Sequence, residues 1–277
     1  MDARLAKLVE AAGLDAMTPA SENPDNEDEW SSICLVDLRK PGAPRVAGWR
    51  ARNFVYPAST YKLYVLGEAI RQVCTGKIGL DDHYPVEPHN VRSGSRLAEG
   101  DEPSLSEVLR LMMMYSDNTA ANVAIDIVDR RNATALMHAM GCQGSEITRK
   151  YLSRDLEDPG YADVPGTTSS ALHFATFLYA VETACIGGGR GRGLIKAYMA
   201  TAQTGQDRMR AGLPPSATLY NKTGTWNTFS SQVAIVEDGE AKYILCVLTA
   251  QETEVASPRI AKLTADIHAW MSEKSVR

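Results

Sequence analysis

The sequence predicts an α+β fold, in which strands from both ends of the chain form one antiparallel sheet and a helical subdomain is inserted between them. Short apolar runs bounded by turn residues occur near the start, at residues 32–38, and again near the end, at residues 218–249. Between them, from residue 59 to about 203, apolar side chains recur every three or four positions, as in amphipathic helices. Strand-rich ends around a helical middle are typical of an α/β sandwich joined to an all-α subdomain.

The first elements are predicted to be a helix and a hairpin. Residues 1–10 carry charges among the apolar positions, which indicates an amphipathic helix and not the continuous apolar stretch of a secretion signal. The acidic stretch 21–29 has no apolar periodicity and is expected to be a solvated loop. The apolar run 32–38 and a second extended segment at 46–55 flank the turn signal Pro41-Gly42. These two segments predict an antiparallel hairpin.

The helical middle contains segments with clear spacing of three and four, such as residues 105–115 and 171–181. The glycine-rich run 187–193 resembles a phosphate-binding loop only superficially, because no strand precedes it and no Lys-Ser or Lys-Thr ending follows it. We expect this run to be a mobile connection between helices.

The last part of the chain is predicted to return to strands. Segments 218–223, 229–237 and 241–249 are extended candidates, and Asp238-Gly239 between the last two is a strong hairpin signal. A final helix is predicted at about residues 258–271.

These elements predict one domain, residues 1–277, with two subdomains. Residues 1–74 and 204–277 are expected to form the sheet-and-helix subdomain, and residues 75–203 the all-helical one. A cleft between two such subdomains is the natural place for a functional site.

The composition excludes several classes of function. The net charge is −5 and the 29 basic residues are scattered, so the chain has no nucleic-acid footprint. No run of about 18 apolar residues occurs, so no membrane span is expected. We expect a monomer that binds a small molecule or a peptide. If Met1 is the native start, the location is expected to be cytoplasmic; if a leader was removed, it is expected to be periplasmic or secreted.

The cysteine pattern offers no metal site and no disulfide framework. The five cysteines are odd in number and widely spaced, and most lie in apolar runs. No Cys-x-x-Cys pair or His/Cys cluster has metal-ligand spacing. The five histidines are dispersed and form no recognisable Ser-His-Asp order. We expect buried free thiols, no metal and no cofactor.

Three short motifs carry the chemistry: Ser59-Thr60-Tyr61-Lys62, Ser116-Asp117-Asn118 and Lys222-Thr223-Gly224. A lone Ser-x-x-Lys string is weak, because residues this common produce it about once by chance in a chain of this length. Its position adds weight, since Ser59 stands at a predicted helix start and the spacing of three places Lys62 on the same face. A neutral Lys62 amine can take the proton of the Ser59 hydroxyl, and free N–H groups at the helix start can hold an oxyanion.

Together and in this order, the motifs resemble the signature of class A β-lactamases and penicillin-binding proteins. Ser116 follows Ser59 by 57 residues and Lys222 follows Ser116 by 106, which is similar to the class A arrangement. The resemblance covers residues 3–270. It implies a β-lactamase/transpeptidase-like fold and a serine hydrolase that acts on cyclic amides without a metal or an organic cofactor.

The resemblance also implies a role for each matching residue. Ser59 would be acylated, Lys62 would help to deprotonate it, and Ser116 would relay a proton to the leaving nitrogen. Substrate binding would fall to four residues: an amide contact from Asn118, a carboxylate contact from Lys222 and Thr223, and an oxyanion hole formed by the backbone N–H groups of Ser59 and Thr225. The alternative for these residues is structural: Asn118 would only satisfy buried backbone near a helix start, and Lys222-Thr223-Gly224 would be an exposed strand end with a glycine turn. Asp117 is expected to be structural.

The loop that should supply the deacylation base departs from the family pattern. Class A enzymes use a glutamate there, but counting from Ser116 leads to Leu152, and counting back from Thr167-Thr168 leads to Ser153. Matching Arg149 to the family's loop arginine places the glutamate position on Tyr151. None of these residues is a carboxylic acid.

Three carboxylates further along the loop leave the base undecided. Asp155, Glu157 and Asp158 lie close enough for a shifted loop to present one of them to the ester. The alternative, which we favour, is that they form a solvated acidic loop without a catalytic role.

The leading hypothesis is therefore a class A-like serine β-lactamase that hydrolyses β-lactam amide bonds through a Ser59 acyl-enzyme. The alternative is a related serine acyltransferase, peptidase or penicillin-binding protein with slow deacylation, acting on an acyl-peptide, in biosynthesis or self-resistance. A third hypothesis, a covalent sensor that signals when acylated, has no effector segment in this sequence to support it.

Overall fold

The computed structural model describes residues 1–18, 29–40, 42–152 and 166–273, and its chain divides into two compact units. Unit 1 consists of residues 1–60, 169–178 and 205–277, and unit 2 of residues 61–168 and 179–204. The subdomain limits inferred from the sequence stay a prediction.

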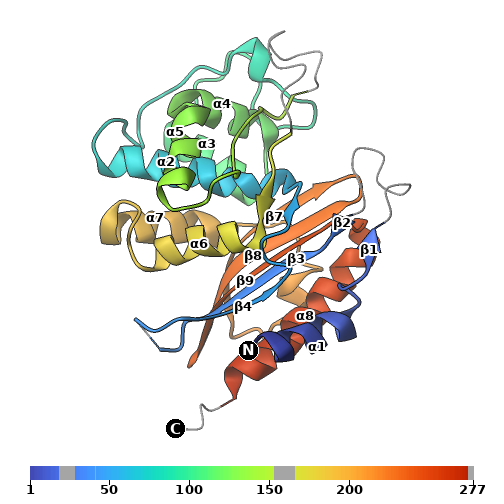
Figure 1. The fold of residues 1–277 in the computed structure, drawn as a ribbon. Coiled ribbons are helices and arrows are strands. Elements are labelled where there is room, and N and C mark those ends of the chain that lie inside the picture. The colour runs from blue at the N-terminus through green and yellow to red at the C-terminus, as the bar shows by residue number, and fades with distance from the viewer. Residues whose placement is uncertain (19–28, 41, 153–165, 274–277) are drawn as a thin grey trace. The chain divides into compact units, whose positions relative to one another are not determined.

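Unit 1 is built on a five-stranded antiparallel sheet with strand order β4-β3-β9-β8-β7 (Figure 1). Its strands are β3 (Ser32–Asp37), β4 (Arg45–Trp49), β7 (Thr218–Trp226), β8 (Phe229–Asp238) and β9 (Ala241–Thr249). Cys34 of β3 pairs with Cys246 of β9, so the strands of this sheet that come first and last in the sequence are hydrogen-bonded neighbours. The predicted sheet from both termini is confirmed.

Two terminal helices cover one face of this sheet, α1 (Asp2–Ala12) and α8 (Thr253–Ser272) (Figure 1). Alternate strand residues such as Leu35 and Leu245 point to this face, because successive side chains of a strand point to opposite sides. Leu5 of α1 and Ile260 of α8 complete the same apolar core, and each of the four side chains is fully buried. Burial of such side chains contributes about 1.5–3 kcal/mol each.

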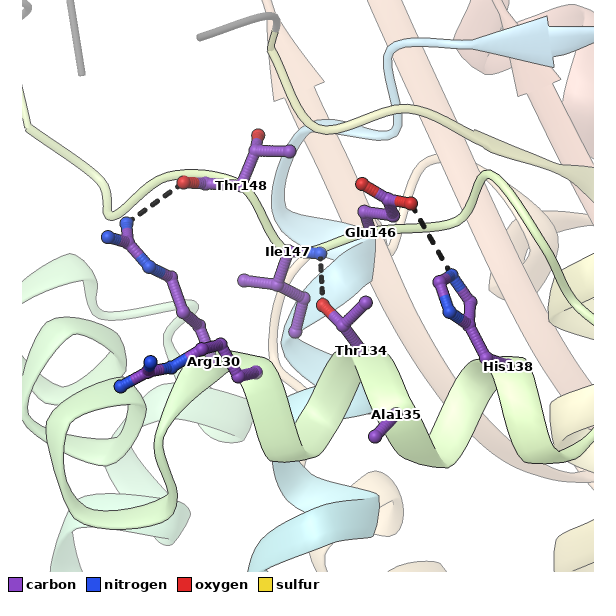
Figure 2. Close-up of a pocket in the computed structure, with 8 residues that line it drawn as sticks. Arg130, Thr134, Ala135, His138, Glu146, Ile147 and Thr148 are labelled. Carbon is purple, nitrogen blue, oxygen red and sulfur yellow. Dashed lines mark hydrogen bonds and ion pairs between the residues drawn. The ribbon is translucent and has the colours of Figure 1, made fainter. Parts of the chain in front are cut away.

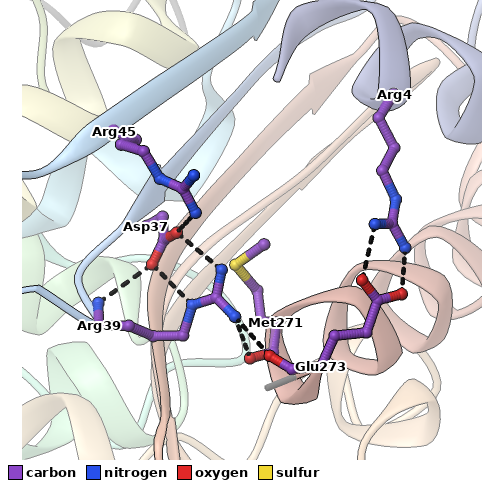
Figure 3. A network of polar contacts seen from close by, with 6 residues as sticks. All are labelled: Arg4, Asp37, Arg39, Arg45, Met271 and Glu273. Carbon is purple, nitrogen blue, oxygen red and sulfur yellow. Dashed lines mark hydrogen bonds and ion pairs between the residues drawn. The ribbon is translucent and has the colours of Figure 1, made fainter. Parts of the chain in front are cut away.

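A polar network ties the chain ends of unit 1 together (Figure 3). The buried Asp37 carboxylate accepts hydrogen bonds from Arg39 at 2.9 Å and Arg45 at 2.6 Å. Arg39 also donates to the backbone oxygens of Met271 and Glu273, and Arg4 pairs with the Glu273 carboxylate. Burial opposes ionisation of Asp37, but the two arginines outweigh it and lower its pKa to about 2.

Two sequence expectations for unit 1 are wrong in their limits. The extended segment predicted at residues 46–55 is interrupted, because Arg50 has a φ of +45° and turns the chain between β4 and β5 (Phe54–Val55). β5 pairs instead with β6 (Ser169–Ser170). Helix α8 begins at Thr253, five residues before the predicted start, and accommodates Pro258 inside the helix at the loss of one backbone hydrogen bond.

Unit 2 is helical, and its central helix is α2 (Lys62–Cys74), whose first nine residues are all buried. Helices α4, α5 and α7 pack against α2. The other helices of this part are α3 (Leu105–Met114), α4 (Asn118–Val128), α5 (Arg130–Ala139), α7 (Gly188–Ala200) and α6 (Ala171–Glu182), which continues from unit 1 into unit 2. The short elements along the chain are β1 (Met17–Thr18), β2 (Glu29–Trp30), η1 (Ala58–Tyr61), η2 (Pro88–Asn90) and η5 (Met209–Gly212).

The glycine-rich run is not a mobile connection, because α7 begins within it at Gly188. Gly187 has a φ of +67°, and a Cβ at this position would lie 2.7 Å from the sulfur of Cys74. A Cβ at Gly191 would overlap the backbone oxygen of Ile186. Glycine therefore permits a close turn onto α2.

The described residues contain neither a cluster of potential metal ligands nor a helix long and apolar enough to cross a membrane. All five cysteines are free thiols, of which Cys34, Cys142 and Cys246 are buried and Cys185 is exposed. Burial raises the pKa of Cys34 to about 12, which makes a thiolate unfavourable there.

Candidate active site

Ser59 lies in η1, which runs without interruption into α2 at Lys62. The two residues are therefore three positions apart on one continuous helical backbone, as the sequence predicted. Ala58, directly before the serine, is buried and has a φ of +47°, an uncommon conformation for a residue with a side chain. Such backbone strain concentrates at functional sites.

In unit 1 the Lys-Thr-Gly strand comes very close to the backbone around Ser59. A Cβ at Gly224 would overlap the Pro57 oxygen and lie 3.1 Å from the backbone nitrogens of Ser59 and Thr60. Only glycine permits this approach. It brings the Ser59 N–H group beside Gly224 of the edge strand β7. The next residue of this strand, Thr225, is exposed.

Two buried cations accompany this strand. The Lys222 side chain is fully buried, and its Nζ donates to the Thr223 oxygen at 2.8 Å. Burial, together with the positive charge of Arg208, lowers the pKa of Lys222 to about 7. Thr223 is also buried. Because the pKa of Lys222 is close to neutral pH, an anionic ligand nearby would stabilise its charged form.

Arg208 is a residue that the sequence motifs did not reveal. Its guanidinium donates to Thr225 Oγ1 at 2.6 Å and to the Gly224 oxygen at 3.1 Å, while burial lowers its pKa. Within the described part of the chain it forms no salt bridge. Arg208 stands outside the three motifs, and no local sequence pattern predicts its contacts. Only the fold places it beside β7.

In unit 2, Lys62 is brought together with the second motif. Lys62 is fully buried, and its Nζ donates to the Ser116 oxygen at 2.5 Å and to Asn118 Oδ1 at 2.7 Å, with Ser116 Oγ at 3.3 Å. These contacts connect a lysine and a hydroxyl that are 54 residues apart in sequence. A proton can pass between such groups without crossing bulk water.

The fold of the Ser116–Asn118 turn explains its geometry. Ser116 has a φ of +58° and connects α3 to α4. Asp117 caps α4, because its carboxylate accepts a hydrogen bond from the backbone N–H of Ala120 at 2.9 Å. The same carboxylate also accepts from the Arg96 N–H at 2.6 Å. Asp117 thus has a structural function, as expected.

Tyr151 of unit 2 lies against the same lysine. Its ring stacks on Tyr61 with 4.7 Å between centroids, and Lys62 Nζ is 4.2 Å from the Tyr151 ring centroid. The Tyr151 backbone N–H donates to Asn122 Oδ1 at 2.8 Å. This loop position therefore presents an aromatic face to the ammonium group.

Helix α5 holds the segment that leads to Tyr151 (Figure 2). Arg130 donates to the Thr148 oxygen at 2.9 Å, and Thr134 Oγ1 accepts from the Ile147 N–H at 3.0 Å. These residues border a cavity of 300 Å³ on the surface of unit 2. The start of the loop is fixed in this way, whereas Asp155, Glu157 and Asp158 lie outside the described residues.

Comparison with known proteins agrees with the motif pattern. The model of the Beta-lactamase enzyme family matches residues 24–271. β-Lactamase AST-1 of Nocardia asteroides is 28% identical over 80% of this chain and 73% of its own length. β-Lactamase 1 of Streptomyces cacaoi is 28% identical over 74% of this chain and 68% of its own length.

Solved structures establish the fold. A β-lactamase from Sphaerobacter thermophilus superposes with a TM-score of 0.79 at 19% identity, covering 96% of both chains. A PBP-A mutant in an acyl-enzyme complex with penicillin G has a TM-score of 0.80 at 17% identity, covering 96% of this chain and 95% of its own. The β-lactamase/transpeptidase-like fold is thus confirmed, and the chain belongs to the β-lactamase enzyme family.

Proposed function

We propose that this chain is a class A-like serine β-lactamase that opens β-lactam amide bonds through an ester on Ser59. The observation that carries the proposal is the contact of buried Lys62 with both Ser116 and Asn118. The family match and the curated relatives, which are β-lactamases, support the same activity.

Acylation begins when the Ser59 oxygen attacks the β-lactam carbonyl carbon and Lys62, as the neutral amine, takes the hydroxyl proton. The negative charge that develops on the carbonyl oxygen is held by the backbone N–H groups of Ser59 and Thr225. The close approach of β7 at Gly224 supports this pairing. When the carbon–nitrogen bond breaks, Ser116 passes a proton to the leaving nitrogen and is reprotonated by Lys62.

Recognition of the substrate uses the polar groups on either side of the motifs. Asn118 hydrogen-bonds the side-chain amide of the small-molecule β-lactam. Lys222 and Thr223 bind the substrate carboxylate, and Arg208 adds a second positive charge beside them. The low pKa of Lys222 fits this role, because a carboxylate offsets the cost of burying the ammonium group.

Hydrolysis ends when water attacks the ester and releases Ser59. The aromatic ring of Tyr151 beside Lys62 supports a deacylation step slower than acylation, because a phenol is a weaker base than a carboxylate assisted by its neighbours. A related acyltransferase, peptidase or penicillin-binding protein has less support, since the curated relatives are named as β-lactamases.

Time-resolved intact mass spectrometry with benzylpenicillin tests the proposal. The expected result is a transient gain of one penicillin mass, located on Ser59 after digestion, followed by many turnovers of product. Ser59→Ala should abolish both signals, and Ser31→Ala, a buried serine outside the motifs, serves as the control. If neither an adduct nor hydrolysis is observed, the lactam assignment is wrong. A permanent adduct without turnover would favour the penicillin-binding alternative.

A further inference from the structure

A second pocket in unit 2 lies next to Ser116 and Asn118 and has a volume of 720 Å³. It is bounded by two segments, residues 93–96 and residues 115–118. The first segment has no function in the mechanism above. Its charged member is Arg96, whose side chain is exposed.

The Arg96 guanidinium lies over an aromatic ring. Its Cζ lies 3.5 Å from the ring centroid of Tyr115, the residue before Ser116. Stacking of a planar guanidinium uses its face and leaves the N–H groups at its edge available for a bidentate acceptor. Among the residues that the structure describes, no carboxylate forms a salt bridge with it.

Hydrogen bonds fix the segment that carries Arg96 onto the start of α4. The backbone N–H of Arg92 donates to Thr119 Oγ1 at 2.8 Å, and Ser95 Oγ accepts from the Thr119 N–H at 3.1 Å. The Arg96 N–H donates to the Asp117 carboxylate at 2.6 Å. The position of Arg96 relative to Asn118 is therefore set by the fold.

The one acidic residue among those that line this pocket does not neutralise Arg96. The Asp117 carboxylate is only 6% exposed, and each of its oxygens accepts a backbone N–H group, from Ala120 and from Arg96. Its charge also faces the positive N-terminal end of α4. The Arg96 side chain is left as an available cation on the pocket wall.

We propose that Arg96 is a specificity-determining residue that favours β-lactams whose acyl side chain carries a carboxylate. This inference rests on the proposed function, in which Asn118 holds the acyl amide. The substituent next to that amide then faces the 93–96 wall, where the stacked guanidinium meets an anionic group with two parallel N–H···O bonds. A neutral side chain gains no such interaction.

Carbenicillin and benzylpenicillin test this directly, because they differ by one carboxylate on the acyl side chain. The second-order rate constant of acylation is measured for both, and the ratio of carbenicillin to benzylpenicillin is compared between wild type and Arg96→Gln. We expect the ratio to fall about fivefold, the value of one exposed ion pair of about 1 kcal/mol. It should fall as well when salt is raised for wild type, but not for the variant.

Two further variants keep the outcome interpretable. Arg96→Lys retains the charge but not the bidentate fork, so part of the ratio should return. Arg131→Gln removes an equally charged side chain that is outside this pocket and pairs with Asp129, and it should leave the ratio unchanged. A ratio that is the same in wild type and Arg96→Gln, with benzylpenicillin still acylated, would overturn the inference alone. If neither penicillin acylates the wild-type protein, the proposed function itself is wrong.

Discussion

Replacement of Tyr151 by leucine should change the pH at which Ser59 becomes acylated. The Tyr151 ring lies 4.2 Å from the Lys62 ammonium nitrogen and stabilises the charged form. In the proposed mechanism, acylation needs the neutral Lys62 amine, so the ring opposes the first step. Leucine fills part of the same volume without a π-system.

The size of the effect follows from the burial of Lys62, which is 0% exposed. A cation–π contact is worth about 0.5–1 kcal/mol when exposed and about 2 kcal/mol when desolvated, so about 1–2 kcal/mol applies here. One pH unit corresponds to about 1.4 kcal/mol. The acid limb of the acylation rate should therefore move about 0.7–1.4 pH units downward in Tyr151→Leu.

The assay is stopped-flow acylation by benzylpenicillin from pH 5 to pH 9, with thermal unfolding as a check on the fold. Tyr151→Phe keeps the ring and serves as the matched control, and its acid limb should stay with that of wild type. An acid limb that does not move in a folded Tyr151→Leu, or that moves to higher pH, refutes the assignment of Lys62 as the base.

Five further outcomes are expected. Lys222, with a pKa lowered to about 7, loses its charge as pH rises, so KM for carboxylate-bearing β-lactams should rise between pH 6 and pH 8.5, and Lys222→Arg should flatten this profile. In the unfolded chain Lys222 keeps its proton up to about pH 10.4, so above pH 7 the unfolded state binds more protons than the folded state. The unfolding free energy of wild type, measured in urea, should therefore gain a contribution that rises with pH above 7, and Lys222→Met should lack this contribution. Gly224→Ala places a methyl group on the Pro57 oxygen and should cost about 1–3 kcal/mol of unfolding free energy and most acylation, whereas Gly239→Ala, with open space around it, should leave acylation intact. Asp37→Asn should cost about 1–3 kcal/mol, measured by urea unfolding at pH 7, and the difference from wild type should vanish as pH falls from 4 to 2, where Asp37 itself takes up a proton. Tyr151→Glu should shorten the life of the penicillin ester measured by mass spectrometry, because it places a carboxylate beside Lys62; an unchanged ester lifetime would argue that the base comes from elsewhere.

The strands β8 and β9 were predicted accurately from the sequence, because their turn signal and their apolar pattern agree with the sheet that they form. The predicted hairpin at Asp238-Gly239 joins β8 and β9, and both strands match their predicted limits within one residue. The segment at 46–55 failed because Arg50 turns the chain with a positive φ, and arginine gives no such signal. Proline is commonest at the first position of a helix, so Pro258 predicts a helix start, but α8 carries it in the second turn.

Some residues of the candidate site are predictable from sequence and others are not. Ser59, Lys62 and Ser116 stand in short motifs whose spacing is visible in the chain. Arg208 and Arg96 do not, because their neighbours come from segments distant in sequence, which no local pattern records. Tyr151 belongs to no motif of its own in the sequence, and its contact with Lys62 depends on how α5 holds the preceding loop segment.

The pairing of β3 with β9 has a consequence for biosynthesis. Cys34 and Cys246 are direct partners although about 210 residues separate them, and the entropy of closing a loop grows with its length. A ribosome that makes the chain from its N-terminus releases β3 long before β9 exists. Residues 61–152 can begin to pack while β3 waits with one edge unpaired, the state in which strands associate with foreign chains. The yield of native protein should therefore depend on how quickly the last third of the chain is translated.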